Sequence, residues 1–227
     1  MKLSVLIPVY DEVHTIENLV KAVEAVSVEK EIILVDDCST DGTRQLLSKS
    51  YGDGRGDIKI IYHDKNLGKG SAVKTALKVA KGCYAVIQDG DLEYDPQDYI
   101  RLLDEAERTE ADVVYGSRFL TTWRSTSFPH FLVNKFLTVI TNILYGSNLT
   151  DMETCYKMIR TDLFKRLNLE SERFEIEPEI TAKLLKRGYK ITEVPVSYKG
   201  RSYHEGKKIT WQDGLATLWA LVRFRYT

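Results

Sequence analysis

Cysteines are few in this sequence, and their positions suit neither metal binding nor cross-linking. Cys38, Cys83 and Cys155 are odd in number and widely separated, and no two of them form a CxxC pair. This spacing argues against a disulfide framework and against a zinc site built from paired thiolates. We therefore expect a protein of a reducing compartment.

The sequence also lacks excess charge, long apolar runs and low-complexity segments. The formal net charge of −1 at pH 7 gives no general attraction to nucleic acid, so no nucleic-acid partner is expected. The apolar run within the opening MKLSVLIPVYDE is too short for a signal peptide or a membrane span. A chain of 227 residues can bury one sizeable core but hardly two. We therefore expect one domain over residues 1–227.

Apolar, strand-like segments alternate with helical patterns along the chain. Apolar runs predict strands at residues 3–9, 31–35, 58–62, 84–87, 111–115 and 191–196. Helical periodicity follows each of the first four runs, including a helix at about 71–81, and returns at 128–146, 178–187 and 211–227. This alternation predicts an α/β fold that is doubly wound around a mostly parallel sheet.

The segment QDGDLEYDP at residues 88–96 directly follows a strand that reads as buried. Ligands of open α/β sheets collect at the carboxyl ends of such strands. Asp89 and Asp91 are separated by one residue, so in extended backbone both carboxylates can face one divalent cation, with Glu93 as a weaker third ligand. Solvated turn acids ahead of Pro96 are the alternative, which the strand-end position and the preceding Gln88 disfavour. The pattern favours metal-assisted transfer of a group from a nucleotide diphosphate.

Polar residues at other predicted strand ends can be interpreted either as ligand-binding residues or as purely structural or solvated ones. Asp37, in DDCSTDGT, can accept hydrogen bonds from a nucleotide base or a ribose, although the segment is equally typical of a helix-capping turn. Lys69, in NLGKGSAV, can reach a diphosphate or can be a solvated lysine, and the loop lacks the spacing of a P-loop. Arg118, in GSRF, can face phosphate oxygens through both of its guanidinium arms.

Two helical segments and a basic loop raise the question of a lipid surface. Polar residues interrupt the wide apolar face of residues 128–146, which disfavours a bilayer-spanning helix. This segment and the tail, 211–227, fit either a membrane interface or a packed core. Between the last strand and the tail, YKGRSYHEGKKI carries Arg201 and Lys207, where a phosphorylated headgroup would arrive if the run is not a solvated loop.

Taken together, LIPVYDE, DDCSTDGT, NLGKGSAV, QDGDLEYDP, GSRF and EVPVSYKGRSYHEGKKI resemble the family 2 glycosyltransferases over nearly the whole chain. Within that family the chain is most similar to the group of dolichol-phosphate mannose synthases and polyprenyl-phosphate glycosyltransferases. The resemblance implies a GT-A fold, a Mg or Mn ion, and inverting transfer of a hexose, with mannose or glucose favoured. The donor would be a GDP- or UDP-sugar and the acceptor a polyprenyl or dolichyl phosphate.

The resemblance also implies roles for individual residues. Asp89, Asp91, Arg118 and Arg201 would be catalytic, with Asp89, Asp91 and Glu93 as the metal ligands. The acceptor phosphate would meet Arg118, Arg201 and Lys207. The donor would be held by Pro8, Tyr10, Glu12, Asp37, Lys69, Gln88, Asp89 and Gly90. Gly90 and Cys38 replace an alanine and a glycine that are common in the family, and both are small enough for binding to survive.

The resemblance further divides the chain and places it in the cell. Residues 1–117 would bind the nucleotide-sugar, 118–210 would form the acceptor side, and 211–227 would be an amphipathic terminal helix. The protein would be cytoplasmic and peripherally associated with the cytoplasmic face of a membrane, where it could meet a membrane-protein partner.

Three alternatives stay open from the sequence. A family 2 enzyme acting on a glycan or protein hydroxyl needs a base, for which Asp151 and Glu153 are the candidates. A haloacid-dehalogenase-type phosphatase is disfavoured because DGDLE lacks the following Thr or Val and lies on the fourth strand. A scaffold that binds nucleotide-sugar without turnover is disfavoured by the presence of both acids, Asp89 and Asp91.

Overall fold

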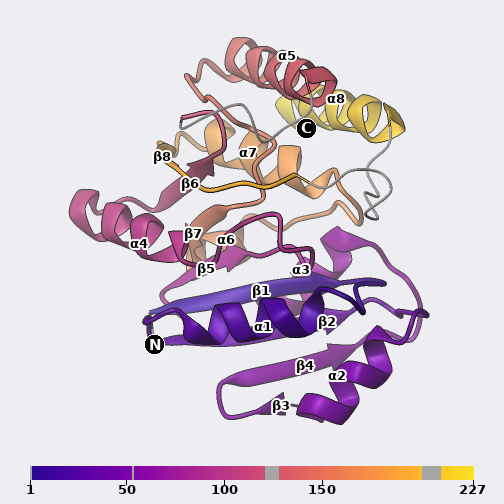
Figure 1. The fold of residues 1–227 in the computed structure, drawn as a ribbon. Helices are drawn as coiled ribbons and strands as arrows, with labels where there is room; N and C mark the ends of the chain where they lie inside the picture. Colours follow the sequence, from indigo (N-terminus) through magenta and orange to yellow (C-terminus); the bar gives the residue numbers. More distant parts are fainter. Residues whose placement is uncertain (1, 53, 121–127, 201–210) are drawn as a thin grey trace.

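The computed structural model describes residues 2–52, 54–120, 128–200 and 211–227, and these ranges contain an eight-stranded sheet (Figure 1). Across the sheet the strand order is β3-β4-β2-β1-β5-β7-β6-β8. The strands are β1 (Leu3–Val9), β2 (Lys30–Asp36), β3 (Gly54–Arg55), β4 (Ile58–Tyr62), β5 (Tyr84–Ile87), β6 (Val113–Ser117), β7 (Lys157–Arg160) and β8 (Thr192–Pro195).

Helices connect and cover these strands. They are α1 (Ile16–Ala25), α2 (Thr43–Tyr51), α3 (Lys69–Val79), α4 (Asp98–Thr109), α5 (Phe128–Tyr145), α6 (Thr161–Arg166), α7 (Ile176–Lys186) and α8 (Trp211–Tyr226). Helices α5 and α8 lie side by side at one end of the molecule, and α7 contacts both of them (Figure 1). The predicted α/β class with a mostly parallel sheet is confirmed, because β4, β2, β1 and β5 pair in parallel, as do β6 and β8.

The central strands are apolar along their length because helices cover the sheet. In β1, Leu3, Val5, Leu6 and Ile7 are all fully buried, which explains why this strand shows no alternation of polar and apolar residues. Pro8 is compatible with a central position because the pairing of β1 with β5 ends at Leu6. Strands β1 and β5 can therefore diverge beyond that point, at the carboxyl edge of the sheet.

Strand β7 and helix α6 are elements that the sequence patterns did not predict. β7 is antiparallel to both β5 and β6 and lies between them. It is only four residues long, with a basic residue at each end, so its apolar pattern is too short to distinguish from a loop. One of those basic residues, Lys157, is fully buried against a glutamate on α7, a long-range contact that no local pattern reports.

Helices α5 and α8 pack against each other and also leave apolar side chains exposed. Leu137 on α5 and Leu221 on α8 belong to one buried cluster. On the other side, Ile143 of α5 is 76% exposed and Trp219 of α8 is 68% exposed. Among the described helices, none is long and apolar enough to cross a bilayer. The two helices therefore combine a packed face with an exposed apolar one.

Candidate active site

The predicted donor residues meet at the carboxyl edge of the parallel strands. Strands β4, β2, β1 and β5 run in the same direction, so the segments that follow them emerge at the same edge. These segments are residues 63–68, 37–42, 10–15 and 88–92. The sheet therefore brings together stretches of sequence that lie up to eighty residues apart.

Hydrogen bonds join the segment after β1 to the segment after β2. The Asp11 amide donates to the Ser39 hydroxyl at 2.9 Å, and the Glu12 amide donates to the Thr43 hydroxyl at 2.9 Å. In return, the Thr40 amide donates to the Asp11 carboxylate at 2.7 Å. These bonds fix the backbone directly after Tyr10, whose side chain is 37% exposed at this edge.

Glu12 also lies against the metal-candidate segment after β5. The Thr15 hydroxyl is 2.8 Å from Glu12 Oε2 and 2.8 Å from the Gly90 carbonyl oxygen. A Cβ atom placed on Gly90 would lie 3.4 Å from Glu12 Cγ and 3.7 Å from the Pro8 carbonyl oxygen. The structure therefore brings together Pro8, Glu12 and Gly90, all predicted from the sequence to hold the donor.

Backbone strain concentrates at the same edge. Asp11, Cys38 and Leu92 have φ values of +49°, +64° and +60°, in the left-handed region that side chains disfavour. Each of them lies just after a central strand, β1, β2 or β5 respectively. Non-glycine residues held in such conformations cluster at ligand sites, where the surrounding contacts over-determine the backbone. The strain thus supports this edge as the functional one.

Asp37 organises the loop between β4 and α3. Its Oδ1 accepts from the Leu67 amide at 2.9 Å and lies 2.7 Å from His63 Nδ1, and its Oδ2 accepts from the Gly68 amide at 2.7 Å. His63 Nε2 lies 3.0 Å from the Thr75 hydroxyl, which ties the same network to α3. Asp37 is therefore a buried anchor for the loop that leads to Lys69, besides its predicted contact with the nucleoside.

The glycines of the NLGKG loop serve close packing. A Cβ atom on Gly68 would lie 2.4 Å from the Glu172 carbonyl oxygen, and one on Gly70 would lie 2.5 Å from the Ser171 carbonyl oxygen. The Ser71 amide donates to that same Glu172 carbonyl at 3.1 Å, so a backbone oxygen from a distant segment caps the start of α3. The structure therefore uses these glycines to dock the segment 171–173, and the contact of Lys69 with a diphosphate stays a prediction.

Gln88 supports the metal-candidate acids from behind. Its side chain is fully buried, and Oε1 accepts from the Tyr99 hydroxyl at 2.5 Å and the Tyr156 hydroxyl at 2.6 Å. Its Nε2 donates to the backbone carbonyl of Asp89 at 3.0 Å. The structure therefore places Gln88 beneath the site, where it fixes the Asp89 backbone.

Asp89 and Asp91, the predicted carboxylate pair, follow β5 at its carboxyl end. The Asp91 carboxylate accepts from the Glu93 amide at 3.1 Å, whereas Glu93 Oε2 accepts from the Tyr198 hydroxyl at 2.6 Å. Across the described ranges, no three His, Cys, Asp or Glu side chains gather so as to hold a metal ion. Glu93 as a third ligand therefore stays a prediction. Two carboxylates suit a divalent ion that takes its other ligands from a phosphorylated substrate and water.

The Lys69 ammonium lies beside these carboxylates and forms an ion pair with Asp89. Its Nζ lies 2.7 Å from Asp89 Oδ1 and 3.0 Å from Glu177 Oε1 on α7, and its side chain is 13% exposed. Burial alone would lower the pKa of Lys69, but the charges of Asp89, Cys155 and Glu177 raise it well above its ordinary value. Asp89 thus already binds a positive group in this structure, which is the charge complementarity that a divalent ion requires.

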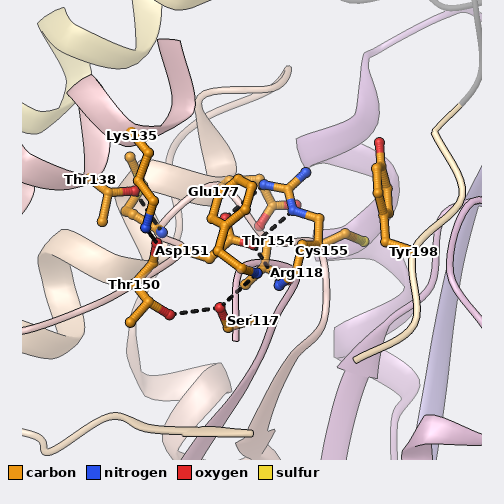
Figure 2. Close-up of polar contacts among 12 residues, drawn as sticks. Ser117, Arg118, Lys135, Thr138, Thr150, Asp151, Thr154, Cys155, Glu177 and Tyr198 are labelled. Carbon is orange, nitrogen blue, oxygen red and sulfur yellow. Dashed lines mark hydrogen bonds and ion pairs between the residues drawn. The ribbon is translucent and has the colours of Figure 1, made fainter. Parts of the chain in front are cut away.

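Arg118 is held by the buried carboxylate of Asp151. Its Nε and one terminal nitrogen donate to the two oxygens of Asp151 at 2.7 Å each, and its amide donates to Asp151 at 3.0 Å (Figure 2). Burial alone would lower the pKa of Arg118, but the facing Asp151 carboxylate raises it well above its ordinary value. Asp151 is positioned in turn by Glu193, which accepts from the amides of Thr150 and Asp151 at 2.8 and 3.1 Å.

Tyr198 connects Arg118 to Glu93. The Arg118 guanidinium lies 5.2 Å above the Tyr198 ring (Figure 2). The hydroxyl of that ring donates to Glu93, as described above. Tyr198 immediately precedes the basic loop in which Arg201 and Lys207 were predicted to bind the acceptor phosphate. Both of those residues lie outside the described ranges.

Glu153 is an acid that stands out by its surroundings. Within the described structure its buried Oε1 accepts no hydrogen bond. Burial raises its pKa to about 7, which Lys157 and Arg118 partly offset and Glu177 and Asp151 reinforce. Of the two acids that the sequence offered as a base, Glu153 is therefore the one with an open acceptor oxygen, because Asp151 is fully engaged by Arg118.

The chain belongs to Glycosyl transferase family 2, whose profile matches residues 4–167. It is 28% identical over 215 residues to "Dodecaprenyl-phosphate galacturonate synthase" of Rhizobium johnstonii, and 30% identical over 223 residues to "Dolichol-phosphate mannosyltransferase" of Pyrococcus furiosus. These matches cover 91% and 92% of this chain but 62% and 61% of the relatives. The chain thus spans about three fifths of the length of these relatives. An uncharacterized protein of Methanocaldococcus jannaschii is 27% identical, with 88% of both chains covered.

Solved structures share the fold. Glucosyl-3-phosphoglycerate synthase from Mycobacterium tuberculosis, in complex with UDP, matches 99% of this chain and 80% of its own with a TM-score of 0.72 and 17% identity. Residues 1–349 of S. aureus TarS, in complex with UDP-GlcNAc, match with a TM-score of 0.66 and 17% identity, covering 99% of this chain and 66% of that one. The predicted GT-A fold is confirmed, and the chain is a glycosyltransferase domain of family 2.

Proposed function

We propose that this domain transfers a hexose, with inversion, from a GDP- or UDP-sugar to a polyprenyl phosphate and requires Mg or Mn. The observation that carries the proposal is the Asp89–Asp91 pair at the carboxyl edge of the sheet, with Lys69 bound to Asp89 at 2.7 Å. The acceptor class is supported by the names of the Rhizobium and Pyrococcus relatives, both of which refer to a polyprenyl or dolichyl phosphate. The metal is supported by a structural neighbour in complex with Mn2+ and UDP.

On the donor side, Asp89 and Asp91 would hold the divalent ion, which supplies a Lewis acid for the departing nucleoside diphosphate. Lys69 would donate to the diphosphate from beside Asp89, in a charge-assisted hydrogen bond. Tyr10 and Glu12, fixed by the hydrogen bonds to residues 39–43, would hold the nucleoside together with Asp37. These groups would orient C1 of the sugar for attack from the face opposite the leaving group.

On the acceptor side, the nucleophile would be a phosphate oxygen of the lipid. A phosphate monoester has a second pKa of about 6, so it is largely ionised near neutrality and requires no protein base. Arg118 would help to position this anion, and the paired Asp151 would keep the guanidinium in place. Arg201 and Lys207 are proposed to complete the phosphate contacts.

A membrane surface is the natural location for such an acceptor. Phe136, Val139 and Ile143 on α5 are 59%, 51% and 76% exposed, and Leu215 and Trp219 on α8 are 58% and 68% exposed. Exposed apolar side chains on packed amphipathic helices suit an interfacial contact with lipid. We therefore propose peripheral association with the cytoplasmic face of a membrane, where a membrane-protein partner would find the same surface.

Glu153 gives a second candidate reaction a specific basis. Transfer to a glycan or protein hydroxyl requires a general base, and a buried carboxyl with a pKa of about 7 and an open acceptor oxygen suits that task. A Glu153→Gln variant distinguishes the two reactions, because it would abolish transfer to a hydroxyl and leave transfer to a lipid phosphate intact.

The proposed function is tested by the partition of labelled sugar. Purified protein would be incubated with Mn2+, a polyprenyl phosphate and, in turn, labelled UDP- and GDP-sugars, and the label would be counted after organic extraction. We expect metal-dependent label in the organic phase from one donor. Release of nucleotide without lipid label would contradict the acceptor, and absence of both from every donor would favour the scaffold.

A further inference from the structure

A chain of alternating charges leads from the metal-candidate acid into the acceptor-side half. Asp89 is bound to Lys69, Lys69 to Glu177 at 3.0 Å, and Glu177 to Lys157 at 2.5 Å. Lys157 is fully buried and also donates to the Thr154 carbonyl at 2.8 Å. Glu177 lies in the first turn of α7, where the helix dipole stabilises a negative charge. It is therefore a fixed anion between two ammonium groups.

The two contacts of Lys69 differ in kind. The Glu177 side chain is 7% exposed, whereas the Asp89 side chain is 26% exposed and lies on the open edge of the sheet. Within the described structure Glu177 Oε1 accepts no hydrogen bond, so its contact with Lys69 is an ion pair without hydrogen-bond alignment. Such a pair holds the ammonium nearby while leaving its N–H groups able to turn toward another acceptor.

We infer that Lys69 is an exchangeable counterion of Asp89, and that Glu177 is the positioning residue that retains it when Asp89 binds the metal. The inference rests on the proposed function, because it takes Asp89 as a metal ligand and a nucleoside diphosphate as the ligand that follows. In the free protein the Lys69 ammonium neutralises Asp89. As the ion binds there, Lys69 would stay with Glu177 and donate to the diphosphate. Lys69 would therefore oppose binding of the metal alone and favour binding of the nucleotide.

If this inference holds, removing the Lys69 charge should raise the affinity for the metal alone and lower the affinity for the nucleotide. Replacing Lys69 by methionine removes the charge and keeps much of the apolar stem, and Lys157 still pairs with Glu177. Without the competing ammonium, the affinity for Mn2+ alone should rise on the order of tenfold, as expected for removing one unit charge at contact distance in a partly solvated site. The affinity for UDP or GDP with Mn2+ should fall by roughly 10- to 100-fold, the range for losing one charge-assisted hydrogen bond.

The role of Glu177 is tested by replacing it together with Lys157, its buried partner. Glu177→Gln alone would leave the Lys157 ammonium unpaired in the interior, which endangers folding. The double variant Lys157→Met/Glu177→Gln removes both charges and leaves Lys69 with Asp89 as its partner. We expect lower affinity for Mn2+ alone, opposite in direction to Lys69→Met, and lower affinity for the nucleotide. The control is Glu31→Gln, since the half-buried Glu31 accepts from the Ser4 hydroxyl at 2.6 Å and the Lys81 amide at 2.5 Å, at the opposite edge of the sheet from this site.

The experiment is titration calorimetry of the wild type, Lys69→Met, the double variant and Glu31→Gln, with Mn2+ alone and then with UDP or GDP at saturating Mn2+. The predicted result is tighter Mn2+ and weaker nucleotide binding for Lys69→Met, with both affinities unchanged for Glu31→Gln. If Lys69→Met binds Mn2+ as the wild type does or more weakly, the inference is overturned while the proposed function stands. If the wild type binds neither ligand, the proposed metal and donor site itself is overturned, and the inference with it.

Discussion

The buried carboxyl of Glu153 should make the stability of the domain depend on pH in a defined way. In the folded chain its pKa is raised from an ordinary 4.5 to about 7, primarily by burial. Below pH 4.5 the carboxyl is neutral in both the folded and the unfolded chain and contributes no difference. Between pH 4.5 and 7 the unfolded chain ionises while the folded chain stays protonated, so stability falls as pH rises. Above pH 7 the carboxyl is ionised in both states, and the loss of folding free energy stays constant at its full size.

The size of this penalty follows from the displacement of the pKa. Each unit corresponds to about 1.36 kcal/mol, so the displacement to about 7 corresponds to roughly 3 kcal/mol at its full extent. Glu153→Gln keeps the shape of the side chain but cannot ionise. It should therefore change the free energy of unfolding little at pH 4.5 and raise it by about 2–4 kcal/mol at pH 8.

Urea denaturation of the wild type and of Glu153→Gln, at half-unit steps from pH 4.5 to 8, measures this difference. Glu172→Gln serves as the control because Glu172 is exposed. The reasoning is refuted if the difference between wild type and Glu153→Gln is constant across this range, or if the variant is the less stable protein at pH 8.

Three further predictions concern the backbone of the site and the exposed helices. Gly90→Ala should leave metal and nucleotide affinity unchanged in calorimetry, because its Cβ would meet Glu12 Cγ at an ordinary 3.4 Å; a loss of tenfold or more would contradict this. Cys38→Gly should raise the free energy of unfolding by roughly 0.5–1 kcal/mol in urea, because φ is +64° there. A lower stability would show that the contact of the Cys38 thiol with the Asp64 carbonyl oxygen, at 3.6 Å, outweighs the strain. Ile143→Glu on α5 should reduce co-sedimentation of the protein with anionic lipid vesicles and leave its melting temperature within a few degrees of the wild type. Lys49→Glu on α2 is the control. Equal vesicle binding by both variants would argue against a lipid-binding surface on α5.

The strands in the first half of the chain could be predicted because burial on both faces leaves a clear mark on the sequence. The runs at 3–9 and 58–62 coincide with β1 and β4, and Asp37, Asp89 and Asp91 were predicted at the carboxyl ends of strands, where β2 and β5 place them. Parallel strands need continuous apolar runs, and their loops emerge at one edge. Those two rules sufficed for this half.

The support of the site could not be predicted, because it depends on contacts between distant segments. In the sequence, Glu177 looks like a surface acid within EIEPEI. Its partner Lys69 lies more than a hundred positions away, and its partner Lys157 lies twenty positions away. Gln88 reads as a donor contact, whereas its amide is enclosed by Tyr99 and Tyr156. The buried Lys157 at the start of β7 requires a carboxylate partner, which Glu177 supplies, but nothing in the local sequence marks this lysine as buried.

The most direct test of the account is the mass of the lipid product. Polyprenyl phosphate, Mn2+ and the donor that labels the organic phase would be incubated with the wild type and with Asp91→Asn, whose melting temperatures should agree within a few degrees. The account predicts a lipid phosphate heavier by one hexose with the wild type, none without metal, and none with Asp91→Asn. An unmodified lipid beside released nucleotide, or an equal yield from Asp91→Asn, would contradict it.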